Sequence, residues 1–162
     1  MRRSLFVALG VAIAFVLGGQ TAYGAAPMRI VQLPVHDTIP AGAVCPFAVA
    51  VDSVTINEKA TVWSGGRVIL TGNSVERITN LATGKSVVVN VSGPFTLTSA
   101  GGVDTFMATG RNLFGLRSGD LGPGQPGALL LTTGLVIFTQ SPSGVTFTHV
   151  GGTTENLCQT LS

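Results

Sequence analysis

The sequence predicts an all-β protein whose antiparallel strands form a meander that closes, or nearly closes, into a barrel. Apolar residues alternate with polar ones through most of the chain after residue 44, and short glycine-rich segments separate the alternating runs. Glycines inside the long runs indicate strong curvature, which a barrel accommodates while removing open sheet edges. A two-sheet β-sandwich is the alternative, and it explains the same pattern less economically.

The first 24 residues have the order of a secretory signal peptide. Arg2 and Arg3 give a positive start, residues 5–17 form an apolar run interrupted only by Gly10, and small residues follow. The apolar run is shorter than the roughly 20 residues that a membrane-spanning helix needs. We therefore expect cleavage before Ala25, a secreted, extracellular product and no membrane span after cleavage.

Charge excludes one class of partner. The chain has nine Lys and Arg and seven Asp and Glu, and both Arg2 and Arg3 belong to the predicted signal peptide. The remaining chain then has seven basic and seven acidic residues and no basic run, so nucleic acid is not an expected partner. Charged residues make up only 10% of the chain, against roughly 25% in an ordinary domain, which is typical of an extracellular β protein with a hydroxyl-rich surface.

The mature sequence is expected to begin with a leader, followed by one β domain at residues 44–162. Residues 25–43 contain three prolines and no steady period, which predicts an extended surface leader or a partly ordered arm. Alternation starts at Cys45, and a hairpin is expected around the turn at residues 64–66. The strands expected in the first half are 45–51, 60–63, 67–71 and 75–80.

The second half continues as hairpins. Gly84 supplies the positive φ for a turn between residues 78–80 and 86–91, and Gly93-Pro94 interrupts the run that follows. No stretch has a convincing helical period over three turns. The remaining expected strands are 95–98, 103–113, 129–140 and 145–150, with a loop at 115–127, giving eight to nine strands in all.

The two cysteines, Cys45 and Cys158, are predicted to form a disulfide. An even cysteine count in an exported chain favours a disulfide, and His36 and His149 lack the spacing of a zinc site. We therefore expect no metal and no cofactor. In the chain-entropy model this closure stabilises the fold by about 4–5 kcal/mol, and it requires the first and last elements to be neighbours.

Polar residues in phase with apolar ones are the candidate binding residues. Arg77 follows Val75, and Arg111 and His149 share faces with apolar residues of their own runs. Inside a barrel, these three residues would be the polar groups of a pocket, and a buried arginine would need an acidic partner. The simpler interpretation places Arg111 and His149 at strand ends, where their side chains reach water.

Trp63, the only tryptophan, is the fourth candidate. Its ring would stack on a sugar in a binding site, but the favoured interpretation is a barrel plug or core residue. The sequence contains no Gly-x-Ser-x-Gly elbow, phosphate loop or calcium loop. No catalytic residue is therefore predicted.

Several segments together resemble small secreted proteins of actinobacteria. They are CPF at 45–47, TGKSV at 83–87, SGP at 92–94, ATGRNL at 108–113 and LTTG at 131–134, with a cysteine near the end. The resemblance covers roughly residues 45–158, implies a secreted product of a Gram-positive, high-GC bacterium and transfers no catalytic residue. By analogy of fold alone, the meander is similar to lipocalin-like or allene-oxide-cyclase-like barrels.

Three functional hypotheses follow. The favoured one is a secreted, non-catalytic domain that binds a small apolar ligand or a cell-envelope component. The first alternative is a barrel enzyme of cyclase or isomerase type with a polar pocket around Arg111 and His149. The second is a cell-surface structural or interaction protein that works through a sheet edge or the loop at 115–127. No pattern in the sequence specifies an oligomeric state.

Overall fold

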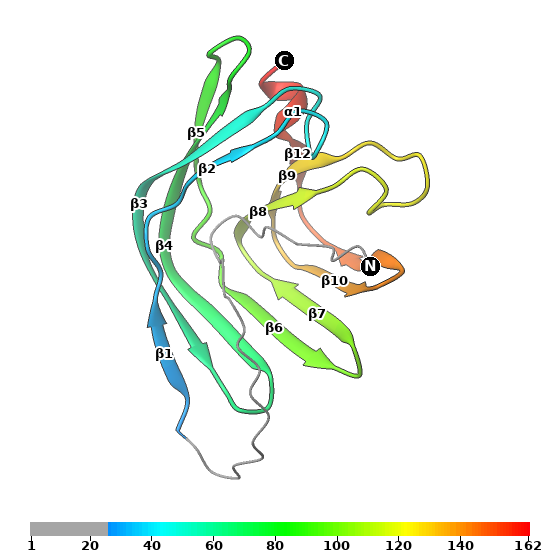
Figure 1. Cartoon of the computed structure of the whole chain (residues 1–162). Helices are drawn as coiled ribbons and strands as arrows, with labels where there is room; N and C mark the ends of the chain where they lie inside the picture. The colour runs from blue at the N-terminus through cyan, green and yellow to red at the C-terminus, as the bar shows by residue number, and fades with distance from the viewer. Residues whose placement is uncertain (1–25) are drawn as a thin grey trace.

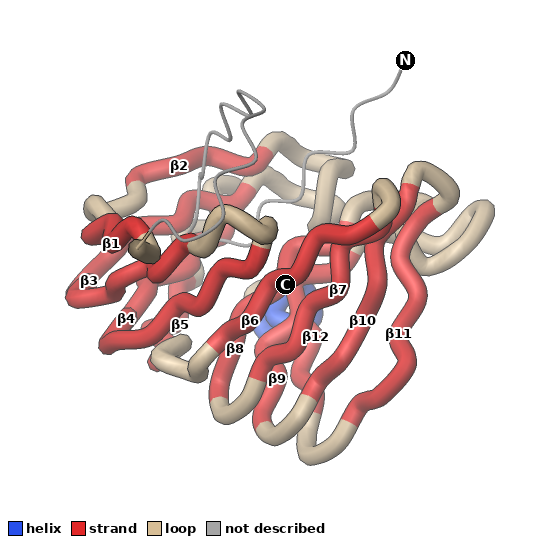
Figure 2. The backbone as a smooth tube through the Cα atoms, turned by 90° about the horizontal axis from the view of Figure 1, so that it is seen from below, coloured by secondary structure: helices blue, strands red, loops and turns tan. Residues whose placement is uncertain are grey.

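The computed structural model describes residues 26–162, so the predicted signal peptide lies outside the described residues. The described chain is all-β with antiparallel pairing, as predicted, and has one short C-terminal helix (Figures 1 and 2). No helix within residues 26–162 is long and apolar enough to cross a bilayer. The elements are β1 Met28–Val31, β2 His36–Ile39, β3 Val49–Val62, β4 Arg67–Asn80, β5 Ser86–Asn90, β6 Phe95–Ala100, β7 Val103–Ala108, β8 Arg111–Leu116, β9 Ala128–Thr133, β10 Val136–Ser141, β11 Gly144–Val150, β12 Thr154–Asn156 and α1 Leu157–Thr160.

The strands of the described chain form two sheets and not the closed barrel that the sequence favoured. The large sheet has the order β1-β3-β4-β6-β7-β10-β11, with β2 also paired to β3 and β5 also paired to β4, and the small sheet has the order β12-β9-β8. Two sheets are what the sandwich alternative requires. In both ribbon views the large sheet curves, so that β1, β3 and β4 lie on one side and β7, β10 and β11 on the other (Figures 1 and 2).

Two changes of partner explain why the meander does not close. The first part of β4 pairs with β6 and its last part pairs with β5, because the Gly93-Pro94 break separates these two strands. After β7 the chain leaves the large sheet, and β8 and β9 form a hairpin in the small one. The meander therefore divides between two sheets instead of continuing around a barrel.

The long hairpin of β3 and β4 dominates the large sheet. Its register runs from Val49 opposite Asn80 to Val62 opposite Val68, with one bulge between Ser53 and Thr55. The sequence predicted each of these 14-residue strands as two shorter ones. Gly72-Asn73 predicts a bend between residues 67–71 and 75–80, but β4 continues through this dipeptide without a break.

Two short strands come from the segment predicted as a leader. β1 pairs with the end of β3, β2 pairs with its beginning, and both pairings are antiparallel. Pro27, Pro34 and Pro40 all fall outside these strands, because proline lacks the N–H that a ladder needs.

Two separate apolar clusters fill the interior. The first joins β3, β4, β5, β8, β9 and α1 around the predicted disulfide, which is present with Cα atoms of Cys45 and Cys158 5.4 Å apart. The second joins β3, β4, β6, β7, β8 and β10, where the rings of Phe106 and Phe138 stack at 4.6 Å between centroids. Both clusters draw on β3 and β4, which leaves the middle of these two strands between them.

Candidate functional site

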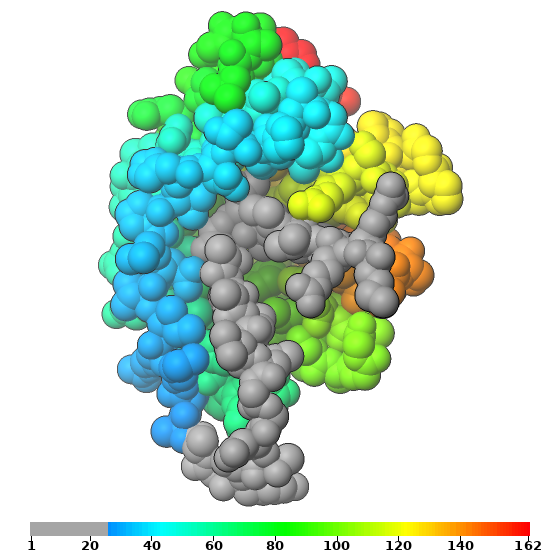
Figure 3. All heavy atoms as spheres, viewed as in Figure 1, coloured from blue at the N-terminus to red at the C-terminus, as the bar shows by residue number. Residues whose placement is uncertain are grey.

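A pocket of about 490 Å³ lies between β2, the loop that follows it and the end of β8. This volume is within the range of small-molecule sites, which begins at roughly 300 Å³. Figure 3 shows β2 and its loop, in blue and cyan, beside the yellow-green end of β8 and the yellow loop after it. The lining residues are Asp37, Thr38, Ile39, Pro40, Gly42, Ala43, Val44, Gly115, Arg117 and Ser118.

The pocket has an apolar floor because its deepest residues belong to the first apolar cluster. Ile39 lies opposite Val49 in the register of β2 and β3, and Val44 directly precedes the disulfide-bonded Cys45. Both Ile39 and Val44 are buried, as is Gly115 of β8. A ligand in this pocket would therefore contact aliphatic side chains and backbone.

The loop that forms one wall is held by local hydrogen bonds and by the disulfide. Gly42 adopts a φ of 81°, which glycine tolerates best, and its N–H donates to the Cys45 carbonyl at 2.7 Å. Across the pocket the Ser118 hydroxyl donates to the Gly42 carbonyl at 3.3 Å. The disulfide to Cys158 ties the same loop to α1, so the wall is anchored at both ends.

Two opposite charges stand at the rim of the pocket. Asp37 accepts a hydrogen bond from the Thr38 N–H at 2.8 Å. Arg117 is exposed, and its guanidinium has no hydrogen bond or ion pair within residues 26–162. Its backbone N–H is satisfied by Asp120 at 2.7 Å, which fixes the position of the residue while leaving the side chain available. The rim therefore offers a cation to an anionic group.

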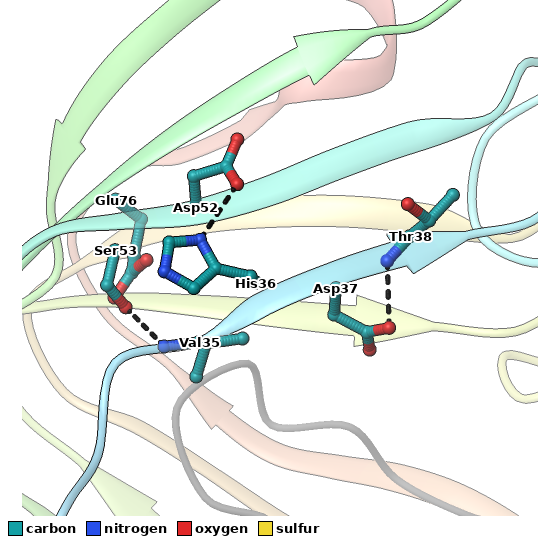
Figure 4. A network of polar contacts seen from close by, with 7 residues as sticks. All are labelled: Val35, His36, Asp37, Thr38, Asp52, Ser53 and Glu76. Atoms are coloured by element: carbon teal, nitrogen blue, oxygen red, sulfur yellow. Dashed lines mark hydrogen bonds and ion pairs between the residues drawn. The ribbon is translucent and has the colours of Figure 1, made fainter.

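A polar network connects the start of β2 to the interior (Figure 4). The Val35 N–H donates to the Ser53 hydroxyl at 2.9 Å, and that hydroxyl donates to Glu76 Oε1 at 3.2 Å. On the surface beside it, His36 Nδ1 and Asp52 Oδ1 lie 3.2 Å apart. Since both of these side chains are exposed, the pair contributes little to stability. The internal branch is different, because it ends on a buried carboxylate.

Glu58 and Glu76 are buried in the middle of β3 and β4. Their exposed fractions are 4% and 1%, respectively. Burial, together with the nearby negative charge of Glu76, raises the pKa of Glu58 to about 7. Burial also raises the pKa of Glu76, while hydrogen bonds from Ser74 and Ser53 act in the opposite direction.

Neither glutamate was predicted as a site residue, although the sequence contains the signal. Glu76 stands two residues from Ser74 and from Ile78, both buried, and Glu58 stands two residues from the buried Ala60. A carboxylate in phase with buried residues is a candidate functional group. Arg77 was predicted as a binding residue instead, because Val75, two residues before it, is aliphatic.

No family model, curated protein or solved structure matches this chain. Among residues 26–162, no three His, Cys, Asp or Glu side chains come together in a way that would hold a metal ion. The candidate function is therefore drawn from the pocket and from the buried carboxylates themselves.

The four residues predicted as ligand contacts lie apart from the pocket and from one another. Arg77 is exposed on the outer face of β4, Arg111 is exposed at the start of β8 in the small sheet, and His149 is exposed on β11. Trp63 is half-buried just after β3, and the guanidinium of Arg67 lies 5.4 Å from its ring. None of the four lines the pocket between β2 and β8.

Proposed function

We propose that this protein is a non-catalytic binding protein for a small apolar molecule with an anionic head group, held in the pocket between β2 and β8. The observation that carries the proposal is the combination of a buried aliphatic floor, formed by Ile39 and Val44, with the unpaired guanidinium of Arg117 at the rim. Ligand sites are typically apolar with a few polar groups that fix orientation. A cell-envelope component with an acyl chain and an acidic head has the same chemistry.

The two parts of the pocket contribute differently. Contact with the floor removes apolar surface from water, at about 25 cal/mol per Å². Arg117 can form two parallel hydrogen bonds to a carboxylate or phosphate, which adds orientation as well as affinity. Asp37 on the same rim opposes an anion and favours a ligand whose negative charge lies toward Arg117.

Secretion into an oxidising compartment is part of the same proposal. The Cys45–Cys158 disulfide supports it, since such bonds persist mainly outside the cytosol. The disulfide-anchored loop then keeps the pocket wall in place without a ligand, which lowers the ordering cost of binding.

The experiment compares two probes with the same apolar body, octanoate and octanol. Residues 25–162, prepared with the disulfide formed, are titrated by calorimetry. We expect octanoate to bind better and R117Q to weaken it about tenfold, as for loss of a charged hydrogen bond. R29Q, which changes an exposed arginine of β1 away from the pocket, is the matched control. Equal affinity of octanoate and octanol, or an R117Q protein that binds octanoate normally, overturns the proposal.

The two alternative functions lack a comparable observation. The enzyme alternative needs Arg111 and His149 to converge on one substrate, but they are exposed and lie in different sheets. The surface-interaction alternative would use a sheet edge or the loop at 115–127, whereas the pocket is lined in part by residues of the first apolar cluster. Ligand binding is therefore the function that the described geometry supports best.

A further inference from the structure

Glu58 and Glu76 lie on the inner face of the β3–β4 hairpin, between the two apolar clusters. Toward one end of the hairpin Val51 pairs with Ile78, and toward the other Ala60 pairs with Leu70. All four of these aliphatic residues are buried. The two carboxylates therefore occupy an acidic section with an aliphatic wall at each end.

The hydrogen bonds around Glu76 satisfy only half of its carboxylate. Oε1 accepts from the Ser74 hydroxyl at 2.8 Å and from the Ser53 hydroxyl at 3.2 Å. Oε2 is buried and has no hydrogen-bond partner among the described residues. A buried acceptor without a donor destabilises the folded state, and more strongly when it is charged. The orphaned oxygen is thus an observation separate from the clustering of the two acids, and it indicates a missing donor.

Glu58 is buried as a residue, but among the described residues only Oε2 of Glu76 is a fully buried side-chain oxygen without a partner. No hydrogen bond or ion pair reaches its carboxylate within residues 26–162, although its side chain is 4% exposed. The residue opposite it in the register is Gly72, which has no side chain to cover the carboxylate. Within the described residues, no donor therefore reaches the carboxylate of Glu58 or Oε2 of Glu76.

Nearby charges do not neutralise the pair. Besides the glutamates, the titratable groups that act on Glu76 are His36 and Asp52, which have opposite effects on its pKa. Lys59 and Arg77 follow Glu58 and Glu76 in sequence, but both are exposed, as the alternation of a strand requires. Within residues 26–162, no lysine, arginine or histidine forms an ion pair with either glutamate.

We propose that Glu58 and Glu76 form a buried binding site for the ammonium group of a small primary alkylamine. An ammonium group has three N–H donors and one positive charge, and it matches Oε2 of Glu76 and the unpartnered carboxylate of Glu58. The aliphatic walls on both sides suit an alkyl chain. A divalent metal ion fits less well, because the described residues bring no third His, Cys, Asp or Glu to these two.

This site is distinct from the pocket between β2 and β8 and prefers the opposite charge. Neither Glu58 nor Glu76 lines that pocket. If R117Q does not weaken octanoate binding, the pocket proposal is refuted and the amine site is unaffected. If E58Q and E76Q do not weaken alkylamine binding, the amine site is refuted and the pocket proposal is unaffected.

The test uses residues 25–162 with the disulfide formed, titrated with hexylammonium at pH 7.5 by calorimetry and by NMR. We expect binding in the range of about 1 mM or tighter, weakened about tenfold or more by E58Q and by E76Q. E155Q, which changes an exposed glutamate of β12, and R117Q should bind as the wild-type chain does. If E76Q does not fold, E58Q decides the question alone, because its carboxylate has no hydrogen bond to lose.

Proton release on binding distinguishes direct contact with the amine from a purely structural role of the glutamates. Burial leaves Glu58 partly protonated near neutral pH, and an ammonium group favours the ionised form. Titration in two buffers of different ionisation enthalpy should therefore show protons leaving the wild-type protein and fewer leaving E58Q, in which only Glu76 has a raised pKa. Absence of hexylammonium binding up to about 10 mM overturns the proposal. Stabilisation by Na⁺ or Ca²⁺ but not by the amine overturns it in favour of a metal site.

Discussion

Replacing Glu58 by glutamine should stabilise the protein at neutral pH and remove much of its pH dependence. Burial raises the pKa of Glu58 from 4.5 to about 7, so the folded state holds a proton that the unfolded state releases. The difference of about 2.5 between these pKa values corresponds to about 3 kcal/mol. This stabilisation is fully present below pH 4.5 and is lost as the pH rises through about 7.

E58Q has no carboxylate to ionise and breaks no hydrogen bond. Its free energy of unfolding should equal that of the wild-type chain at about pH 4.5 and exceed it by about 3 kcal/mol at pH 8.5. The pKa of Glu76 is also raised, so E58Q should retain a smaller loss of stability with rising pH. The whole difference between the two proteins should develop in the range from pH 4.5 to about 7.5.

Urea denaturation across this pH range, followed by the fluorescence of the single tryptophan, measures the effect directly. E155Q serves as the control, since it makes the same chemical change at an exposed position. Parallel stability curves for the wild-type chain and E58Q would refute the reasoning, because they would mean that the Glu58 carboxylate titrates alike in the folded and unfolded states.

Two further predictions concern the framework. Replacing Cys45 and Cys158 together by serine should lower the free energy of unfolding by about 4–5 kcal/mol, because the bond closes a loop with a sequence separation of 113 residues. A loss of less than about 1 kcal/mol, measured by urea denaturation, would contradict this. G72A should destabilise more than G84A. Both glycines have a positive φ, but a Cβ at Gly72 would lie 2.1 Å from the Asn57 carbonyl oxygen, whereas one at Gly84 would contact no atom. Equal urea midpoints for the two variants would contradict the expected clash.

The strands and the disulfide were predictable because their signals are local or compositional. Alternation located residues 145–150, whereas the strand predicted at 103–113 is two strands, β7 and β8, in different sheets. An even cysteine count in a chain predicted to be exported indicated the pairing of Cys45 with Cys158, which is confirmed. Closure into a barrel was wrong for a reason that lies outside any local window. Whether β4 has one partner or two, and whether β8 stays in the large sheet, depends on contacts between residues far apart in the chain.

The site was harder to predict because β4 carries aliphatic residues on both faces. Ile69 and Val75 point one way and Val68 and Ile78 the other, so alternation alone does not show which face is interior. Placing Val75 inward makes Arg77 a pocket residue, whereas the structure buries the opposite set and makes Glu76 the interior group. The bulge between Ser53 and Thr55 also shifts the phase of β3, which separates Glu58 from the pattern that precedes it.

The choice of glutamate at position 58 is itself an argument for use of the carboxylate. Glutamine has nearly the same shape, would lose no hydrogen bond that the described chain makes, and would avoid the ionisation penalty at neutral pH. The apolar clusters at both ends of the β3–β4 hairpin hold the two strands in register. The fold therefore tolerates the cost of ionising the buried Glu58 carboxylate, although this cost does not stabilise it. Proteins accept such local costs chiefly at functional sites. If E58Q is more stable and no longer takes up the amine, the same side chain accounts for both the cost and its purpose.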